Sequence, residues 1–121
     1  MIAPRLIELF KEITVIPALS GKERPMADYI HNFVSRLGLH SYEDNTFTRW
    51  NGDAGNILCP VAGGGDFIMT AHMDTPRPTT ETKVIVDEEK ITSDGTTALG
   101  VDNRAGVTIL LYTLEKIVKE N

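Results

Sequence analysis

The sequence predicts an α/β layered domain in which a mixed sheet is flanked by helices. Three observations indicate this fold class. Apolar residues recur at helical spacing near both ends of the chain. The run DFIMTA at 66–71 is short and almost continuously apolar, which is typical of a central strand covered on both faces. Two further apolar runs flank a polar turn at 87–90 and predict a hairpin. Helices, then strands, then a helix favour α/β layers.

Two helices are predicted before the first strand. Apolar positions at helical spacing indicate a helix over about 3–13, which ends before Pro17. The tetrapeptide SGKE then fits a capping box, in which Ser20 caps free N–H groups and Glu23 reaches back. One apolar face follows over a second helix at about 21–37. Gly38 suits the position just after that helix, where a positive φ is needed.

The middle of the chain predicts short strands, and the end predicts a third helix. Strands are expected at 40–43 and 56–61, joined by an irregular polar stretch around 51–55. The central strand at 66–71 comes next, followed by a hairpin of Val84–Val86 with Ile91–Thr92. The final helix is expected over about 103–119, where a broad apolar face predicts deep burial.

Composition narrows the functional classes. The chain has 121 residues, enough for one modest domain, and a net charge of −5 with no basic stripe, so no nucleic-acid partner is expected. No apolar run approaches the ~20 residues of a membrane span, and charged residues interrupt any signal-peptide core. The one cysteine, Cys59, allows no intramolecular disulfide and is expected to be a small buried hydrophobe. We expect a cytoplasmic protein without a membrane partner.

The first candidate site is His72-x-Asp74, which follows the predicted central strand. In an extended segment, residues two apart point the same way, and ligand sites gather at the carboxyl ends of strands in open α/β sheets. A metal-bound imidazole is usually oriented by a carboxylate on its other nitrogen, and Asp74 is placed for that role. The alternative is a strand-end histidine that hydrogen-bonds a loop.

The second candidate is Asp102, which stands just before the last helix between Gly100 and Gly106. A carboxylate has two oxygens and can bridge two metal ions about 3.5–4 Å apart. The alternative is that Asp102 or Asn103 caps the helix.

Together the two motifs resemble a known family. AHMDTP at 71–76, followed by TSDGTTALGVDNRAG at 92–106, is similar to the co-catalytic zinc exopeptidases, the group of tripeptidase T, the aminoacylases and the bacterial carboxypeptidases. The chain looks most like the tripeptidase T-like members. The opening LIELFKEITVIPALSGKERPMADYIHNFVSRLGL and the later GNILCPV match as well, so the resemblance covers essentially the whole chain.

The resemblance implies roles for particular residues. His72 matches a metal-ligating histidine, Asp74 the aspartate that orients it, and Asp102 the aspartate that bridges two zinc ions. Asn103 occupies a position where a cis peptide bond is common in the family. The expected activity is zinc-dependent hydrolysis of peptide bonds in short peptides, with a glutamate as general base.

The resemblance also implies that residues 1–121 are the N-terminal portion of a metallopeptidase catalytic domain. The family's Glu-Glu pair, a further carboxylate and a distal histidine have no counterpart here, nor has the lid domain that often forms the homodimer. Glu115 and Glu120 are expected to be solvated helix charges, and His31 and His40 to be structural or surface residues. We therefore predict that this polypeptide alone is inactive and binds zinc weakly, because two ligands cannot complete a tetrahedral site.

Alternatives remain within and outside this fold. An N-acyl amino acid amidohydrolase or a dipeptidase would share the same motifs, and the absent lid would decide among them. A zinc aminopeptidase group with His-x-Asp-Glu fits less well, because Thr75 follows Asp74. In another class, a truncated, non-catalytic protein would bind a partner through an exposed edge strand and apolar helix faces.

Overall fold

The computed structural model describes residues 2–63 and 65–120, and its first two elements are the predicted helices. Helix α1 spans Pro4–Thr14 and confirms the helix expected over 3–13. Its proline lies in the first turn, where a backbone N–H is not needed. Helix α2 spans Arg24–Arg36. Gly38 follows it with φ +77°, as expected, and its N–H donates to the carbonyl of Ser35 at 2.9 Å.

The start of α2 differs from the prediction. The helix begins later than 21, its N-cap is Glu23, and the predicted capping box does not form. The carboxylate of Glu23 instead accepts a hydrogen bond from the N–H of Gly21, at 2.7 Å. The hydroxyl of Ser20 is bonded to another part of the chain, so it is not available as a cap. A tertiary contact has overridden a local motif.

The strands form two small antiparallel sheets. β1 (Tyr42–Glu43) pairs with β2 (Ile57–Leu58), so these strands are shorter than predicted, and the 3-10 helix η1 (Thr46–Arg49) lies between them. β3 (Val84–Val86) pairs with β4 (Ile91–Ser93) and confirms the predicted hairpin. The carboxylate of Asp87 accepts hydrogen bonds from the backbone N–H groups of Glu89 and Lys90, both at 2.8 Å, and so shapes the turn.

The central strand predicted at 66–71 is wrong for this chain. Residues 66–71 form no strand and belong to neither sheet, and the side chains of Phe67 and Ile68 are 77% and 80% exposed. An apolar run becomes a buried central strand only when strands flank it on both sides. No described segment of this chain pairs with residues 67–70, so the sheet that would cover them is incomplete.

The last helix, α3, spans Val101–Glu120 and contains the helix predicted over 103–119. Its inward positions include Val107, Leu111 and Leu114, but Ile117, which belongs to the apolar face predicted to be deeply buried, is exposed. Glu115 is also not the solvated charge that was predicted. It is buried and paired with Arg5 of α1 at 3.0 Å, which joins the two helices.

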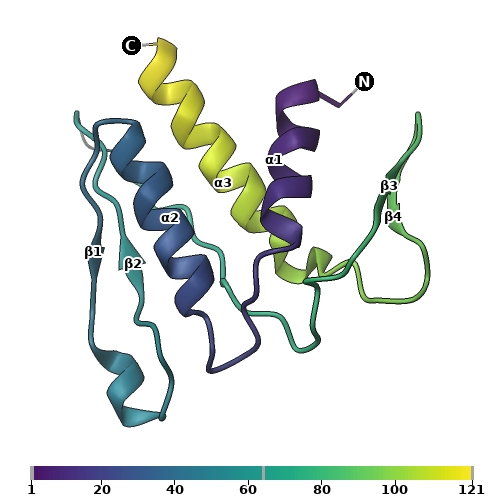
Figure 1. Ribbon diagram of the computed structural model, residues 1–121. Coiled ribbons are helices and arrows are strands. Elements are labelled where there is room, and N and C mark those ends of the chain that lie inside the picture. Colours follow the sequence, from purple (N-terminus) through teal and green to yellow (C-terminus); the bar gives the residue numbers. More distant parts are fainter. Residues whose placement is uncertain (1, 64, 121) are drawn as a thin grey trace.

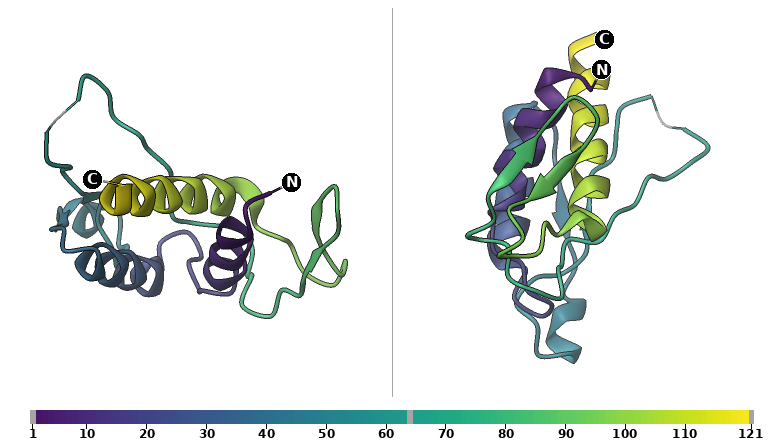
Figure 2. Two further views of the ribbon diagram at one scale, coloured as in Figure 1. Left: turned by 90° about the horizontal axis from the view of Figure 1, so that it is seen from above. Right: turned by 90° about the vertical axis from the view of Figure 1, so that its right-hand side faces the viewer.

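The core lies where the three helices meet. Seen from above, α1 and α2 lie apart on the same side of α3, and α1 packs against α3, while the β3–β4 hairpin projects to one side (Figures 1 and 2). The main apolar cluster comprises Leu9, Ile13, Ala18, Met26, Phe33, Val107 and Leu111.

Two further expectations concern burial and membranes. Cys59 is only partly buried, so the expectation of a buried thiol is wrong. Within the part of the chain that the structure describes, no helix is long and apolar enough to cross a bilayer.

Candidate metal centre

The segment that carries His72 is held against the loop between α1 and α2. A parallel bridge joins Leu19 and Thr75. The N–H of Thr75 donates to the carbonyl of Ala18 at 2.8 Å, and the N–H of Ser20 donates to the carbonyl of Thr75 at 3.2 Å. These two bonds fix the backbone just beyond Asp74, although residues 67–70 before it are unpaired. The site therefore rests on a defined backbone.

His72 and Asp74 contact each other as the motif predicts. Nδ1 of the imidazole lies 2.9 Å from Oδ1 of Asp74. The second carboxylate oxygen, Oδ2, accepts a hydrogen bond from the hydroxyl of Ser20 at 2.5 Å. With Asp74 as acceptor, Nδ1 carries the proton in the neutral ring and Nε2 presents its lone pair. The first histidine nitrogen is thus occupied and the second faces away from Asp74.

The second histidine nitrogen faces Asp102. Nε2 of His72 lies 2.9 Å from Oδ1 of Asp102, whose side chain is 94% exposed. The peptide bond between Asp102 and Asn103 is cis, as the family resemblance implies. Oδ1 of Asn103 accepts a hydrogen bond from the N–H of Gly106 at 3.0 Å. Asn103 therefore caps the helix, and this leaves the carboxylate of Asp102 free to face the histidine.

The charges in this network support one another. The pKa of His72 is raised above its usual value, chiefly by its hydrogen bond to Asp102 and also by Asp74, and partial burial opposes the rise. The pKa of Asp74 is lowered, first by the hydrogen bond from Ser20 and then by His72. Both ring nitrogens face carboxylates, so the arrangement attracts positive charge at the imidazole, either as a proton or as a metal cation.

Arg104 follows Asp102 by two residues in α3 and is fully buried. Its Nη2 donates to the carbonyl of Ile16 at 2.7 Å, while Nε and Nη1 have no hydrogen-bond partner among the described residues. Burial lowers the pKa of Arg104 to about 10, and the charge of Asp74 opposes this change. The guanidinium therefore remains charged at neutral pH and interacts electrostatically with Asp74.

The donor atoms fit part of a zinc site. Imidazole nitrogen and carboxylate oxygen are both zinc ligands, and a carboxylate on the far ring nitrogen is the usual support of a ligating histidine. His72 and Asp102 would supply the two donors, and Asp74 would supply the support. In residues 2–63 and 65–120, no group of three or more histidine, cysteine or carboxylate side chains is arranged to hold a metal ion. The fit therefore extends to two ligands.

Sequence reasoning identified three members of this network and missed two. His72, Asp74 and Asp102 were candidates and lie together. Ser20 was assigned to a helix cap, and Arg104 had no role, because neither contact is visible in a local pattern. The other histidines are distinct from the site. His31 contacts Ser41 and Glu43 at 2.6 and 2.9 Å, which fits a structural role, and His40 is exposed.

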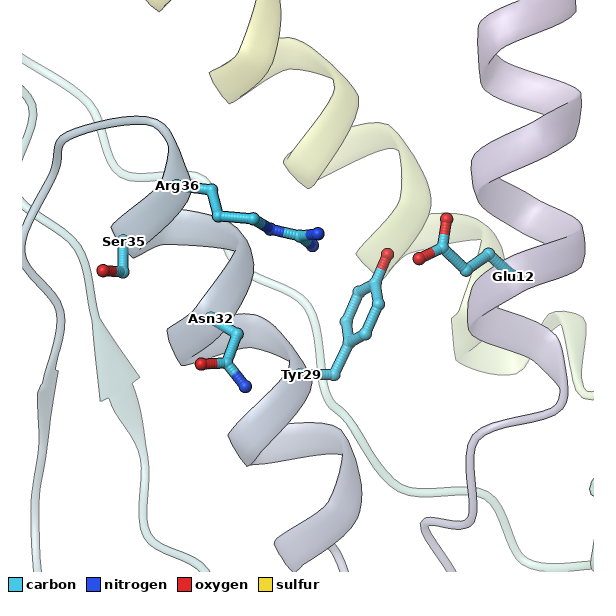
Figure 3. A pocket seen from close by; sticks show the side chains of 5 residues that line it. All are labelled: Glu12, Tyr29, Asn32, Ser35 and Arg36. Carbon is cyan, nitrogen blue, oxygen red and sulfur yellow. The ribbon is translucent and has the colours of Figure 1, made fainter.

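A separate hollow of about 420 Å³ lies between α1 and α2 and shares no residue with the His72 network. Figure 3 shows Arg36 reaching from α2 toward Glu12 on α1, with the hydroxyl of Tyr29 between them. That hydroxyl is buried without a hydrogen-bond partner among the described residues. Burial raises the pKa of Tyr29, and the charge of Glu12 adds to the effect. The remaining lining residues are Asn32 and Ser35.

The chain is similar to known proteins in sequence and in structure. No family model matches the chain. The Bacillus subtilis (strain 168) protein YqjE is 31% identical over 120 residues, which cover 97% of this chain and 32% of YqjE. The structure is similar to that of a tripeptidase from Staphylococcus aureus subsp. aureus Mu50, with a TM-score of 0.80 and 32% identity. It is also similar to aminopeptidase PepT from Bacillus cereus ATCC 10987, with a TM-score of 0.84 and 29% identity.

Both structural matches cover 96% of this chain and 32% of the longer protein. The chain therefore spans about a third of the length of the proteins that it matches. These similarities show that the chain has part of a PepT-like peptidase fold, as the sequence predicted. In sequence and in structure, the chain corresponds to about one third of a tripeptidase-like protein.

Proposed function

We propose that this chain is part of the catalytic domain of a zinc-dependent exopeptidase that hydrolyses peptide bonds in short peptides. One observation carries the proposal. Nε2 of His72 faces Oδ1 of Asp102 at 2.9 Å, while Asp74 occupies the other ring nitrogen. This is the arrangement expected of a ligating imidazole, its orienting carboxylate and a second, carboxylate ligand. The similarity to a tripeptidase and to PepT supports peptide substrates.

His72 and Asp102 would hold the metal, and zinc, when bound, supplies Lewis-acid chemistry to a carbonyl group. Asp74 accepts a hydrogen bond from the Nδ1–H group, so that Nε2, which faces the carboxylate of Asp102, is the nitrogen left to bind a metal. The exposed carboxylate of Asp102 has a second oxygen that is free to reach another cation. These residues bind and orient, and none of them is placed as a general base.

In this proposal, the catalytic site is completed by residues that this chain does not contain. Two ligands do not complete a tetrahedral zinc site, so the other ligands and the general base would come from the part of the relatives' length that this chain does not span. The lid domain, and dimerisation through it, would belong to that part as well. We therefore expect the 121-residue chain to show no peptidase activity alone. Turnover that copurifies with this chain and disappears in His72→Ala would contradict that expectation.

A chimera tests the function directly. The matching third of Bacillus cereus PepT is replaced by this chain, and hydrolysis of a tripeptide is measured with added zinc. We expect activity that falls by at least about 10³-fold in His72→Ala and in Asp102→Asn, because each change removes a metal ligand. Ser35→Ala, an exposed change on α2, is the matched control and should retain full activity.

Two further substrates extend this test of the chemistry. A dipeptide and an N-acetyl amino acid are assayed beside the tripeptide. Because the lid of the chimera comes from PepT, these arms test whether this chain's site supports the chemistry, not which side chains it prefers. A folded chimera, judged by circular dichroism, that hydrolyses none of the three would contradict the proposed function.

A further inference from the structure

The loop between α1 and α2 contacts the candidate site at several atoms. Two backbone hydrogen bonds join Ala18 and Ser20 to Thr75, at 2.8 and 3.2 Å, in the manner of a short parallel ladder. This ladder begins one residue beyond Asp74. We refer to residues 16–20, the part of this loop that makes these contacts, as the clamp loop. It aligns the backbone that carries the histidine with the end of α1.

Ser20 adds a side-chain contact to this ladder. Its hydroxyl donates to Oδ2 of Asp74 at 2.5 Å, while Oδ1 of the same carboxylate faces Nδ1 of His72 at 2.9 Å. A carboxylate held at both oxygens cannot rotate about its terminal torsion without losing one of two charge-assisted hydrogen bonds. The orientation of the imidazole therefore depends on the hydroxyl of a residue far away in the sequence.

The other end of the clamp loop is tied to α3. The buried guanidinium of Arg104 donates to the carbonyl of Ile16 at 2.7 Å. Asp102, which faces Nε2 of His72, lies at the start of the same helix. The loop thus contacts the His72 segment at one end and the Asp102 helix at the other. It therefore contacts both of the segments that carry the candidate ligands.

We propose that Ser20 is a positioning residue of the candidate metal centre, and that it acts through Asp74 on the imidazole of His72. The proposal rests on the proposed function, since it assigns Ser20 to the support of a zinc ligand. Helix capping, the local explanation of a serine at this position, is excluded because α2 has no side-chain cap and begins after Glu23. Loss of a residue that hydrogen-bonds to a metal ligand typically lowers metal affinity by about 10- to 100-fold. Ser20 is one hydrogen bond further from the metal, since it contacts the ligand His72 only through Asp74.

The experiment compares Ser20→Ala, Ser20→Thr and the control Ser35→Ala in the 121-residue chain at one fixed pH. Ring ¹⁵N and ¹H resonances of His72 are recorded without metal, and zinc chloride is then titrated in. In Ser20→Ala we expect the Nδ1 resonance to shift and zinc affinity to fall about threefold to tenfold. Ser20→Thr retains a hydroxyl and should restore both values, and Ser35→Ala should change neither.

The two readouts separate this proposal from the proposed function. If the ring resonances in Ser20→Ala match those of Ser35→Ala, Ser20 does not position the imidazole and the proposal is overturned. If the resonances shift but zinc binds to no variant, the positioning contact stands, and the expectation that His72 and Asp102 alone bind zinc weakly is contradicted. Thermal unfolding of each variant shows whether a resonance shift arises from loss of the fold or from loss of the hydrogen bond to Asp74. If Ser20→Ala is unfolded, the test rests on Ser20→Thr, which retains the hydroxyl and should keep the ring resonances of the parent chain.

Discussion

Nε2 of His72 lies 2.9 Å from Oδ1 of Asp102, although 30 positions separate the two residues in the sequence. The contact joins an extended segment to the start of α3. Asp102 is 94% exposed, so the pair is open to solvent and can be reached by an ion or a substrate. Asp74 on the other ring nitrogen makes the imidazole the centre of a three-residue network.

The first prediction concerns zinc. The 121-residue chain should bind zinc much more weakly than a complete structural site, whose binding free energy is about 10–16 kcal/mol, because it supplies only two ligands. Asp102→Asn should abolish this weak binding. The free energy of unfolding of the metal-free chain should change by less than about 0.5 kcal/mol, because the side chain is exposed.

Calorimetry and thermal unfolding measure these two effects. Asp66→Asn removes the same charge from another exposed position and should leave zinc binding unchanged. A tight, stoichiometric site that survives Asp102→Asn would show that the ligands have been misplaced.

The second prediction separates backbone strain from crowding at Gly100. Gly95 and Gly100 both have positive φ, at +88° and +73°. A Cβ on Gly95 meets nothing within 4 Å, whereas a Cβ on Gly100 would lie 2.7 Å from Cγ2 of the buried Thr79. Gly95→Ala should therefore cost about 1–2 kcal/mol of unfolding free energy, from the left-handed backbone alone.

Gly100→Ala should cost more than Gly95→Ala by about 1–3 kcal/mol, because overpacking is added to the same backbone cost. Urea denaturation measures both values. Equal losses in the two variants would mean that Thr79 moves aside freely and that Gly100 does not limit packing beside the site.

The third prediction is a loss of stability in acid that depends on Glu43. Its carboxylate is bonded to Arg24, to the N–H of Gly55 and to His31, and is largely buried. These contacts, with Arg24 the strongest, lower the pKa of Glu43 from 4.5 to about 2. The unfolded chain takes up this proton first as the pH falls. The contribution of Glu43 is therefore complete above about pH 4.5 and is lost progressively toward pH 2.

Glu43→Gln should remove this part of the pH dependence and cost about 2 kcal/mol at pH 7, a typical value for hydrogen bonds to a charged group. Urea denaturation between pH 2 and 7 measures both effects. Glu88→Gln, at an exposed position in the hairpin turn, is the control and should follow the parent chain. An unchanged pH profile in Glu43→Gln would show that the cluster does not stabilise the fold.

The fourth prediction concerns the unpaired apolar segment. Residues 67–70 form no backbone hydrogen bond with another described segment, and Phe67 and Ile68 are 77% and 80% exposed. Such a segment can pair with a strand of another molecule. We expect the chain to self-associate as its concentration rises, and the double change Phe67→Lys with Ile68→Lys to prevent this without loss of stability.

Light scattering coupled to size exclusion measures the association. Trp50→Lys, which removes an 82% exposed side chain outside the segment, is the control and should leave association unchanged. A chain that stays monomeric over the whole concentration range would contradict the prediction, as would association that the double change does not reduce.

The sequence by itself determined the bodies of the three helices, the hairpin and three members of the candidate site. Helical spacing is a local signal, so α1, the body of α2 and α3 could be predicted from neighbouring residues. The β3–β4 hairpin depends on a short polar turn and was also predictable. His72, Asp74 and Asp102 stood out because residue types with metal-binding chemistry occur where a strand or helix is expected to end or begin.

The tertiary structure alone decided the burial of the central segment, the role of Ser20 and the fate of Glu115. Residues 66–71 have the composition of a covered strand, but coverage requires flanking strands, which the described chain does not provide. Serine is a typical helix-capping residue, yet the hydroxyl of Ser20 donates a hydrogen bond to Asp74, because a parallel bridge brings the two segments together. The local pattern predicts a solvated Glu115, but the packing of α1 places Arg5 beside it as an ion-pair partner. In each case the deciding partner is distant in the sequence, so no local pattern could reveal it.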